Sequence, residues 1–144
     1  MNSRIEGPEA ITLPAEYAVL GKLREFVRKA ALGAGLRGAS LDSLLLAVDE
    51  AATNIISHSA QGLPDEILCR CGHDGNSASI SCELVYRADG PFAPEQAPDR
   101  DQILERVRSM KRGGLGVFLT HALVDTIEYG HSGGRNSIRL IVKA

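Results

Sequence analysis

The segment from Leu44 to His58 constrains what this 144-residue chain can fold into more than any other part of it. Its apolar residues recur with the period of an α-helix and share one arc, which predicts a helix with one side against a core. Glu50 and Asn54 fall together outside that arc, one helical turn apart, so their side chains can converge on one point. The residues of the apolar arc are Leu44, Leu45, Val48, Ala51, Ala52 and Ile55.

The chemical types of Glu50 and Asn54 favour a particular reaction class. A glutamate can accept a proton, and the carboxamide oxygen of an asparagine can bind a hard cation such as Mg²⁺. Together they suit Mg²⁺-dependent phosphate chemistry. Taken alone, such a pair is more common as a solvated helix edge, so its interpretation depends on the rest of the chain.

A second pattern is the glycine-rich segment from Arg112 to Gly116, which directly precedes another helical run of apolar residues. A glycine-rich turn at a helix N-terminus exposes backbone N–H groups and the positive end of the helix dipole, which favours a phosphate. The segment lacks the Lys and Ser/Thr of a P-loop. It also does not follow a strand at the spacing of a dinucleotide-binding fingerprint, so neither of those sites is predicted.

In combination and in this order, the two patterns resemble those of the anti-sigma-factor serine/threonine kinases of the GHKL (Bergerat) ATPase superfamily. The resemblance extends over nearly the whole chain, from Leu13-Pro14-Ala15-Glu16 to a last strand after Gly134-Arg135-Asn136-Ser137. It implies an α+β fold, a two-layer sandwich in which helices cover one face of a mixed, mostly antiparallel sheet. It also implies a single domain over residues 1–144, with a lid over about residues 91–112.

The resemblance assigns roles to individual residues. It implies that Glu50 is the general base and that Asn54 is the Mg²⁺ ligand. Arg112 matches a lid arginine that lies near the γ-phosphate and the protein partner. The segment implied to bind the phosphates consists of Gly113, Gly114, Leu115 and Gly116.

The box that reads the adenine departs from the pattern of this family. The family has Asp-x-Gly here, and its Asp accepts a hydrogen bond from the adenine amino group. When Gly90 is placed on that glycine, Ala88 stands at the Asp position and Asp89 at the variable one. A shifted register could bring Asp89 to the adenine, but a slip of one residue in a strand turns every side chain to the opposite face.

The function that the resemblance implies is that of an anti-sigma-type regulator. Such a protein binds ATP and Mg²⁺, phosphorylates a serine of a STAS-type anti-sigma-factor antagonist, and sequesters a sigma factor as a homodimer. Two alternatives stay open. Because of Ala88, the chain could be a catalytically degenerate protein-binding module that keeps only the fold. It could also be the catalytic domain of a split sensor histidine kinase, although no dimerisation helices with a phospho-accepting histidine are evident.

Composition excludes other classes of function. The net charge is −2 and no run of five basic residues occurs, which argues against a direct role on nucleic acid or on a membrane surface. No apolar stretch approaches the roughly 18 residues of a transmembrane helix, and the N-terminus shows no signal-peptide core. We therefore expect a cytoplasmic protein.

The remaining elements are predicted from periodicity and turn residues. We expect helices near residues 15–31 and 115–125, and strands near 65–72, 77–88, 126–131 and 136–143. Ser40 is well placed to cap the helix that carries Glu50. Cys69 and Cys71 alternate in a strand and should point to one face, and together with Cys82 they are expected to be buried, reduced thiols.

Overall fold

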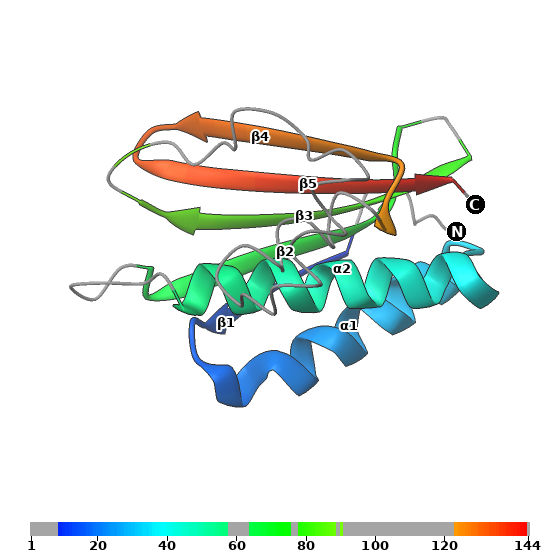
Figure 1. Cartoon of the computed structure of the whole chain (residues 1–144), viewed down its shortest axis with the longest axis horizontal. Helices are drawn as coiled ribbons and strands as arrows, with labels where there is room; N and C mark the ends of the chain where they lie inside the picture. Colours follow the sequence, from blue (N-terminus) through cyan, green and yellow to red (C-terminus); the bar gives the residue numbers. More distant parts are fainter. Residues whose placement is uncertain (1–8, 58–63, 76–77, 89, 91–122, 144) are drawn as a thin grey trace, which may run out of the picture.

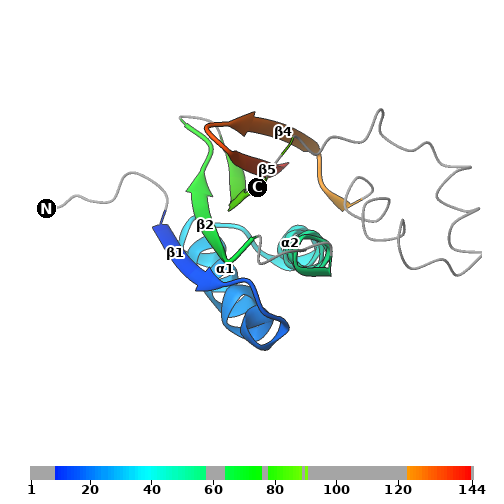
Figure 2. The same cartoon turned by 90° about the vertical axis from the view of Figure 1, so that its left-hand side faces the viewer.

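The computed structural model describes residues 9–57, 64–75, 78–88, 90 and 123–143, and within them two α-helices cover one face of a five-stranded sheet (Figure 1). The view along the strands shows these two layers directly (Figure 2). This α+β arrangement confirms the predicted fold class. The elements are β1 (Glu9–Pro14), the 3₁₀ turn η1 (Tyr17–Val19), α1 (Leu20–Gly33), α2 (Gly38–Ser57), β2 (Glu66–His73), β3 (Ser79–Arg87), β4 (Thr126–Ser132) and β5 (Arg135–Lys143).

The strands lie in the order β1-β2-β3-β5-β4, and every pair among the described strands is antiparallel. Residues 133 and 134 join β4 to β5 in a two-residue turn. Gly133 and Gly134 have φ values of +59° and +75°, which glycine adopts without strain and which suit the twist of a tight hairpin. The bounds of β4 and β5 lie within one residue of the strands predicted at 126–131 and 136–143.

Both helices bury one side, as their sequence periodicity predicts. The apolar arc of α2 is buried in full, from Leu44 to Ile55. In α1 the buried residues Leu23, Val27, Ala30 and Ala31 recur at helical spacing. The helix boundaries differ slightly from the prediction. α2 begins at Gly38, so Ser40 lies inside the helix and the predicted cap is wrong; the amide of Leu41 already bonds the carbonyl of Arg37.

The face of the sheet beneath the helices is apolar and contains all three cysteines. Cys69, Cys71 and Cys82 are buried and reduced, which confirms the prediction for them. The Sγ atoms of Cys69 and Cys82 lie 3.6 Å apart, and the hydrogen bond between the Cys82 thiol and Cys69 is the main factor that raises the pKa of Cys82 well above its usual value. Within the described residues, no group of three or more His, Cys, Asp or Glu side chains could hold a metal ion.

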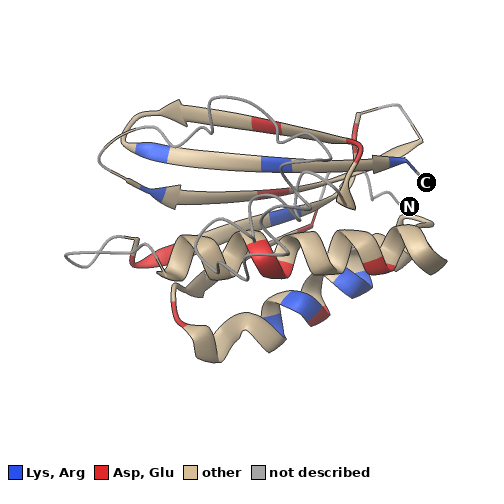
Figure 3. Ribbon diagram, in the orientation of Figure 1, with Lys and Arg blue, Asp and Glu red and all other residues tan. Residues whose placement is uncertain are grey.

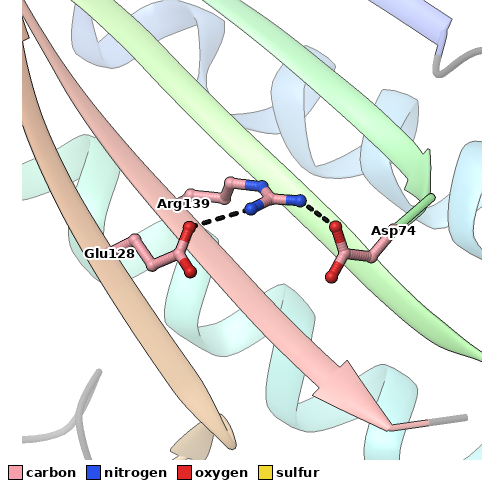
Figure 4. Close-up of polar contacts among 3 residues, drawn as sticks. All are labelled: Asp74, Glu128 and Arg139. Atoms are coloured by element: carbon pink, nitrogen blue, oxygen red, sulfur yellow. Dashed lines mark hydrogen bonds and ion pairs between the residues drawn. The ribbon is translucent and has the colours of Figure 1, made fainter. Parts of the chain in front are cut away.

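The opposite face of the sheet carries a row of charges that alternate in sign from strand to strand. Arg70 on β2 lies opposite Glu83 on β3, which lies opposite Arg139 on β5, which lies opposite Glu128 on β4. Arg139 pairs with Glu128 at 2.8 Å and also with Asp74 (Figure 4). Because these side chains are partly exposed, each pair is expected to contribute only about 0–1 kcal/mol.

Elsewhere on the described surface, charges of both signs are spread over helices and strands (Figure 3). Among the helices that the structure describes, none combines the length and the apolar character needed to cross a membrane.

Candidate active site

Helix α2 carries the two residues that the sequence singled out. Glu50 and Asn54 lie one turn apart on this uninterrupted helix, and both side chains are half-buried, beside the buried residues Ala51 and Ile55. α2 and β3 run towards the same end of the sheet (Figure 1), so this half of the helix lies at the end where β3 leaves the sheet and β5 enters it. Glu50 and Asn54 are not among the buried residues of α2, which confirms their predicted position outside the apolar arc.

The surroundings of Glu50 affect the ionisation of its carboxyl group. Partial burial raises the pKa of Glu50 above its usual value, and the neighbouring charge of Asp49 raises it further. Asp49 itself forms an ion pair of 2.9 Å with Arg24 of α1. A carboxylate with a raised pKa holds a proton more readily, which is the property that a general base requires.

Asn54 lies in the last turn of α2, where helix carbonyls lack partners within the helix. The hydroxyl of Ser57 donates to the backbone carbonyl of Asn54 at 3.1 Å, so this carbonyl is satisfied locally. The side chain of Asn54 supplies a carboxamide oxygen, a ligand type that suits Mg²⁺.

The segment after β3 contains Ala88, which stands where the family has the adenine-reading Asp. The amide of Ala88 donates to the carbonyl of Gly134 at 3.0 Å, and the half-buried methyl group of Ala88 packs against the core. The side chain at this position therefore offers an apolar contact and no hydrogen-bond acceptor for a base. Gly90 is also described, and its backbone carbonyl accepts a hydrogen bond of 3.0 Å from the side chain of Asn136 on β5.

Asn136 belongs to a polar cluster that the sequence analysis did not recognise. Its side chain contacts His131 on β4, with 2.6 Å between Nδ1 and Oδ1, and Tyr86 on β3. Burial raises the pKa of Tyr86, and a hydrogen bond from Asn136 opposes this effect. Burial and the nearby Tyr86 raise the pKa of Tyr129 to about 12. The one signal in the sequence was an asparagine in a strand whose other residues on that face are aliphatic.

The other predicted site residues lie outside the described residues. They are Asp89, Arg112, Gly113, Gly114, Leu115 and Gly116, together with the expected lid over about residues 91–112. Their roles stay predictions.

Comparison with known proteins settles the family. The sequence profile described as histidine kinase-like ATPase domain matches residues 13–142. This chain belongs to the histidine kinase-like ATPase family. The match spans both described helices and nearly all of the described sheet.

Two individual relatives point to one group of proteins within this family, since both are named serine-protein kinase RsbW. The chain is 26% identical to the serine-protein kinase RsbW of Halalkalibacterium halodurans over 91% of its own length and 82% of that protein. It is 28% identical to the RsbW of Listeria innocua over 86% of its length and 80% of that protein. These matches confirm the resemblance to the anti-sigma-factor kinases of the GHKL superfamily.

A solved structure has the same fold. It contains the RsbU and RsbW domains of Rv1364c from Mycobacterium tuberculosis and aligns with a TM-score of 0.63 at 15% sequence identity. The alignment covers 96% of this chain and 32% of that longer chain, so this chain spans about a third of it. At this identity the comparison concerns the fold alone.

Proposed function

We propose that this member of the histidine kinase-like ATPase family is an anti-sigma-type regulator. It binds ATP with Mg²⁺, transfers the γ-phosphate to a serine of a STAS-type antagonist protein, and sequesters a sigma factor. The similarity to proteins named serine-protein kinase RsbW supports this reaction class. The single observation that carries the proposal is the placement of Glu50 and Asn54 one turn apart on α2, outside the buried arc.

Asn54 is the residue proposed to hold Mg²⁺. Its carboxamide oxygen suits this cation, and its place beside buried residues near the end of α2 limits how far it can move. When bound, Mg²⁺ neutralises phosphate charge and orients the nucleotide. The N–H groups of the segment Gly113–Gly116 are proposed to stabilise the phosphates, and Arg112 to neutralise charge from the lid.

Glu50 is proposed to act on the incoming serine. The serine oxygen forms a bond to the γ-phosphorus while the bond from that phosphorus to the bridging oxygen breaks, and ADP leaves. The proton of the serine hydroxyl passes to the carboxylate of Glu50. The raised pKa of Glu50 supports this role because it brings the group closer to the pH at which a base works efficiently.

The protein partners follow from the resemblance. We propose that the chain acts as a homodimer that holds the sigma factor, and that the antagonist competes for an overlapping surface. The relatives' name of serine-protein kinase supports a protein as the substrate. Pull-down of a sigma factor and of a STAS-type protein from the same organism, with ATP and with ADP, is the direct measurement.

Isothermal titration of ATP, with and without Mg²⁺, tests the nucleotide site. Wild type should bind ATP in a Mg²⁺-dependent manner, and Asn54→Ala should weaken that Mg²⁺-dependent part. Asp42→Asn is a matched control, because Asp42 is an exposed acid on the same helix. No binding up to about millimolar ATP, or equal effects of the two variants, would contradict the proposed site.

Phosphotransfer to the antagonist tests Glu50. Glu50→Gln keeps the shape of the side chain but cannot accept a proton, so the transfer rate should fall by about 10²–10⁴-fold with little change in ATP affinity. Transfer at the wild-type rate by this variant would leave Glu50 with a structural role only.

A second candidate function is a protein-binding module without catalysis. The observation that favours it is Ala88, which presents a methyl group to the core where the family has a carboxylate. If Asp89 replaces that carboxylate, wild type should prefer ATP over GTP and Asp89→Ala should lose the preference. Sigma-factor binding without any nucleotide binding would favour the module.

A further inference from the structure

Asn136 is the only buried polar or charged residue in the part of the chain that the structure describes, with 3% of its surface exposed. It occupies the first of four inward positions on β5, and Ile138, Leu140 and Val142 occupy the others. Burying a carboxamide is unfavourable unless its donors and acceptor are bonded. The hydrogen-bond partners of this buried asparagine must therefore offset the cost of its burial.

The partners of Asn136 define its orientation. Nδ2 donates to the carbonyl oxygen of Gly90 at 3.0 Å, so Oδ1 must be the atom that faces His131 at 2.6 Å. The flipped amide would set Oδ1 against the Gly90 carbonyl, and two acceptors would then face each other. Since Oδ1 only accepts, His131 must donate through Nδ1–H. The amide also donates to Tyr86 across the β3–β5 pair.

These contacts join two segments of the chain that are distant in sequence, Tyr86 to Gly90 and His131 to Asn136. His131 on β4 and Tyr86 on β3 are the direct cross-strand neighbours of Asn136. Gly90 lies just beyond the end of β3, in the segment that leads from the sheet toward the expected lid. Asn136 is thus the described side chain that bonds the backbone of this segment to the central strands.

We infer that Asn136 is a positioning residue for the nucleotide base, and this inference rests on the proposed function. By holding the Gly90 carbonyl, Asn136 fixes the backbone of Gly90, the glycine of the adenine-reading box, and therefore how that backbone can approach a base. His131 acts one step further away, because it holds Oδ1 and thereby keeps Nδ2 directed at Gly90. Neither residue needs to contact the nucleotide for this role.

Two substitutions of Asn136 test the inference. Asn136→Leu removes all hydrogen bonds of the side chain but suits the apolar surroundings. Asn136→Asp keeps the shape of the side chain but cannot donate to Gly90. In both variants amide hydrogen exchange near Gly90 should become faster without nucleotide. ATP affinity in the presence of Mg²⁺ should fall about 3–10-fold, the usual worth of one hydrogen bond. GTP affinity should fall less, so the ATP-over-GTP preference should shrink.

Two further variants serve as comparisons. Ser137→Ala alters the next residue of β5, which points to the opposite face of the sheet, and should change neither exchange nor nucleotide selectivity. His131→Ala should have a smaller effect than either Asn136 variant, because His131 is exposed and water can replace it as a donor to Oδ1.

The results of these experiments distinguish a failure of this inference from a failure of the proposed function. Unchanged exchange near Gly90 in both Asn136 variants would overturn the inference, as would equal weakening of ATP and GTP or a wild type without preference between them. If wild type binds neither nucleotide, the proposed function and the role toward a base both fail. Faster exchange in the variants would then still support the bond from Asn136 to Gly90.

Discussion

Leu84 offers the sharpest test of how the sheet packs beneath the helices. Its side chain on β3 is fully buried, and its cross-strand neighbours Cys69 and Ile138 are buried on either side. Leu84→Ala removes three carbon atoms worth about 0.8 kcal/mol each, or about 2.4 kcal/mol. The cavity left behind should bring the total loss in free energy of unfolding to about 3–4 kcal/mol.

Urea denaturation followed by circular dichroism measures this loss. The midpoint should fall while the dependence on urea stays the same, and the melting temperature should drop by roughly 10 °C. Val85→Ala is the matched control, because Val85 is the next residue and points to the other, half-exposed face. It should cost less than about 1 kcal/mol. Equal losses in the two variants would refute the assignment of the buried face.

Three further predictions concern titratable groups. Since the pKa of Glu50 is raised above 4.5, the folded state binds more protons than the unfolded state and loses stability as the pH rises through the pKa of Glu50. Glu50→Gln should therefore raise the melting temperature at about pH 8 but not at about pH 4. Equal shifts at both pH values would contradict this. Asp49→Asn should lower the pKa of Glu50 and move the pH profile of phosphotransfer to lower pH. The buried thiols, including Cys82, should react with Ellman's reagent only after unfolding, and rapid native labelling would disprove their burial.

Local patterns in the sequence predicted both described helices and four of the five described strands, but not β1, and most of the helix expected near residues 115–125 lies outside the described residues. The apolar arc of α2 was predicted residue by residue, because helical periodicity and burial have one common cause. The turn between β4 and β5 lies between the strands predicted at 126–131 and 136–143, where paired glycines adopt the positive φ values of a tight hairpin. The predicted cap at Ser40 was wrong by three residues, because α2 begins at Gly38 and Arg37 is the residue before it; such errors are common where helix ends depend on local backbone bonds.

Contacts between distant segments were beyond local reasoning. Nothing near β5 in sequence indicates that it lies between β3 and β4, since strand order depends on how whole faces pack. The hydrogen bond between Asn136 and Gly90 joins positions 46 residues apart, and the sequence around either residue does not indicate the other. The pair Glu50 and Asn54 was predictable because both residues lie on one helix, where spacing alone fixes their relative position.

The position of β5 also affects how the domain assembles during synthesis. β5 is the last described strand in sequence, yet it lies between β3 and β4 and packs against α2. Until it leaves the ribosome, β4 has no described strand to pair with, and one edge of β3 and part of the apolar side of α2 remain uncovered. Nascent chains that stall before residue 135 should therefore expose a strand edge and apolar surface, which are the features that chaperones bind.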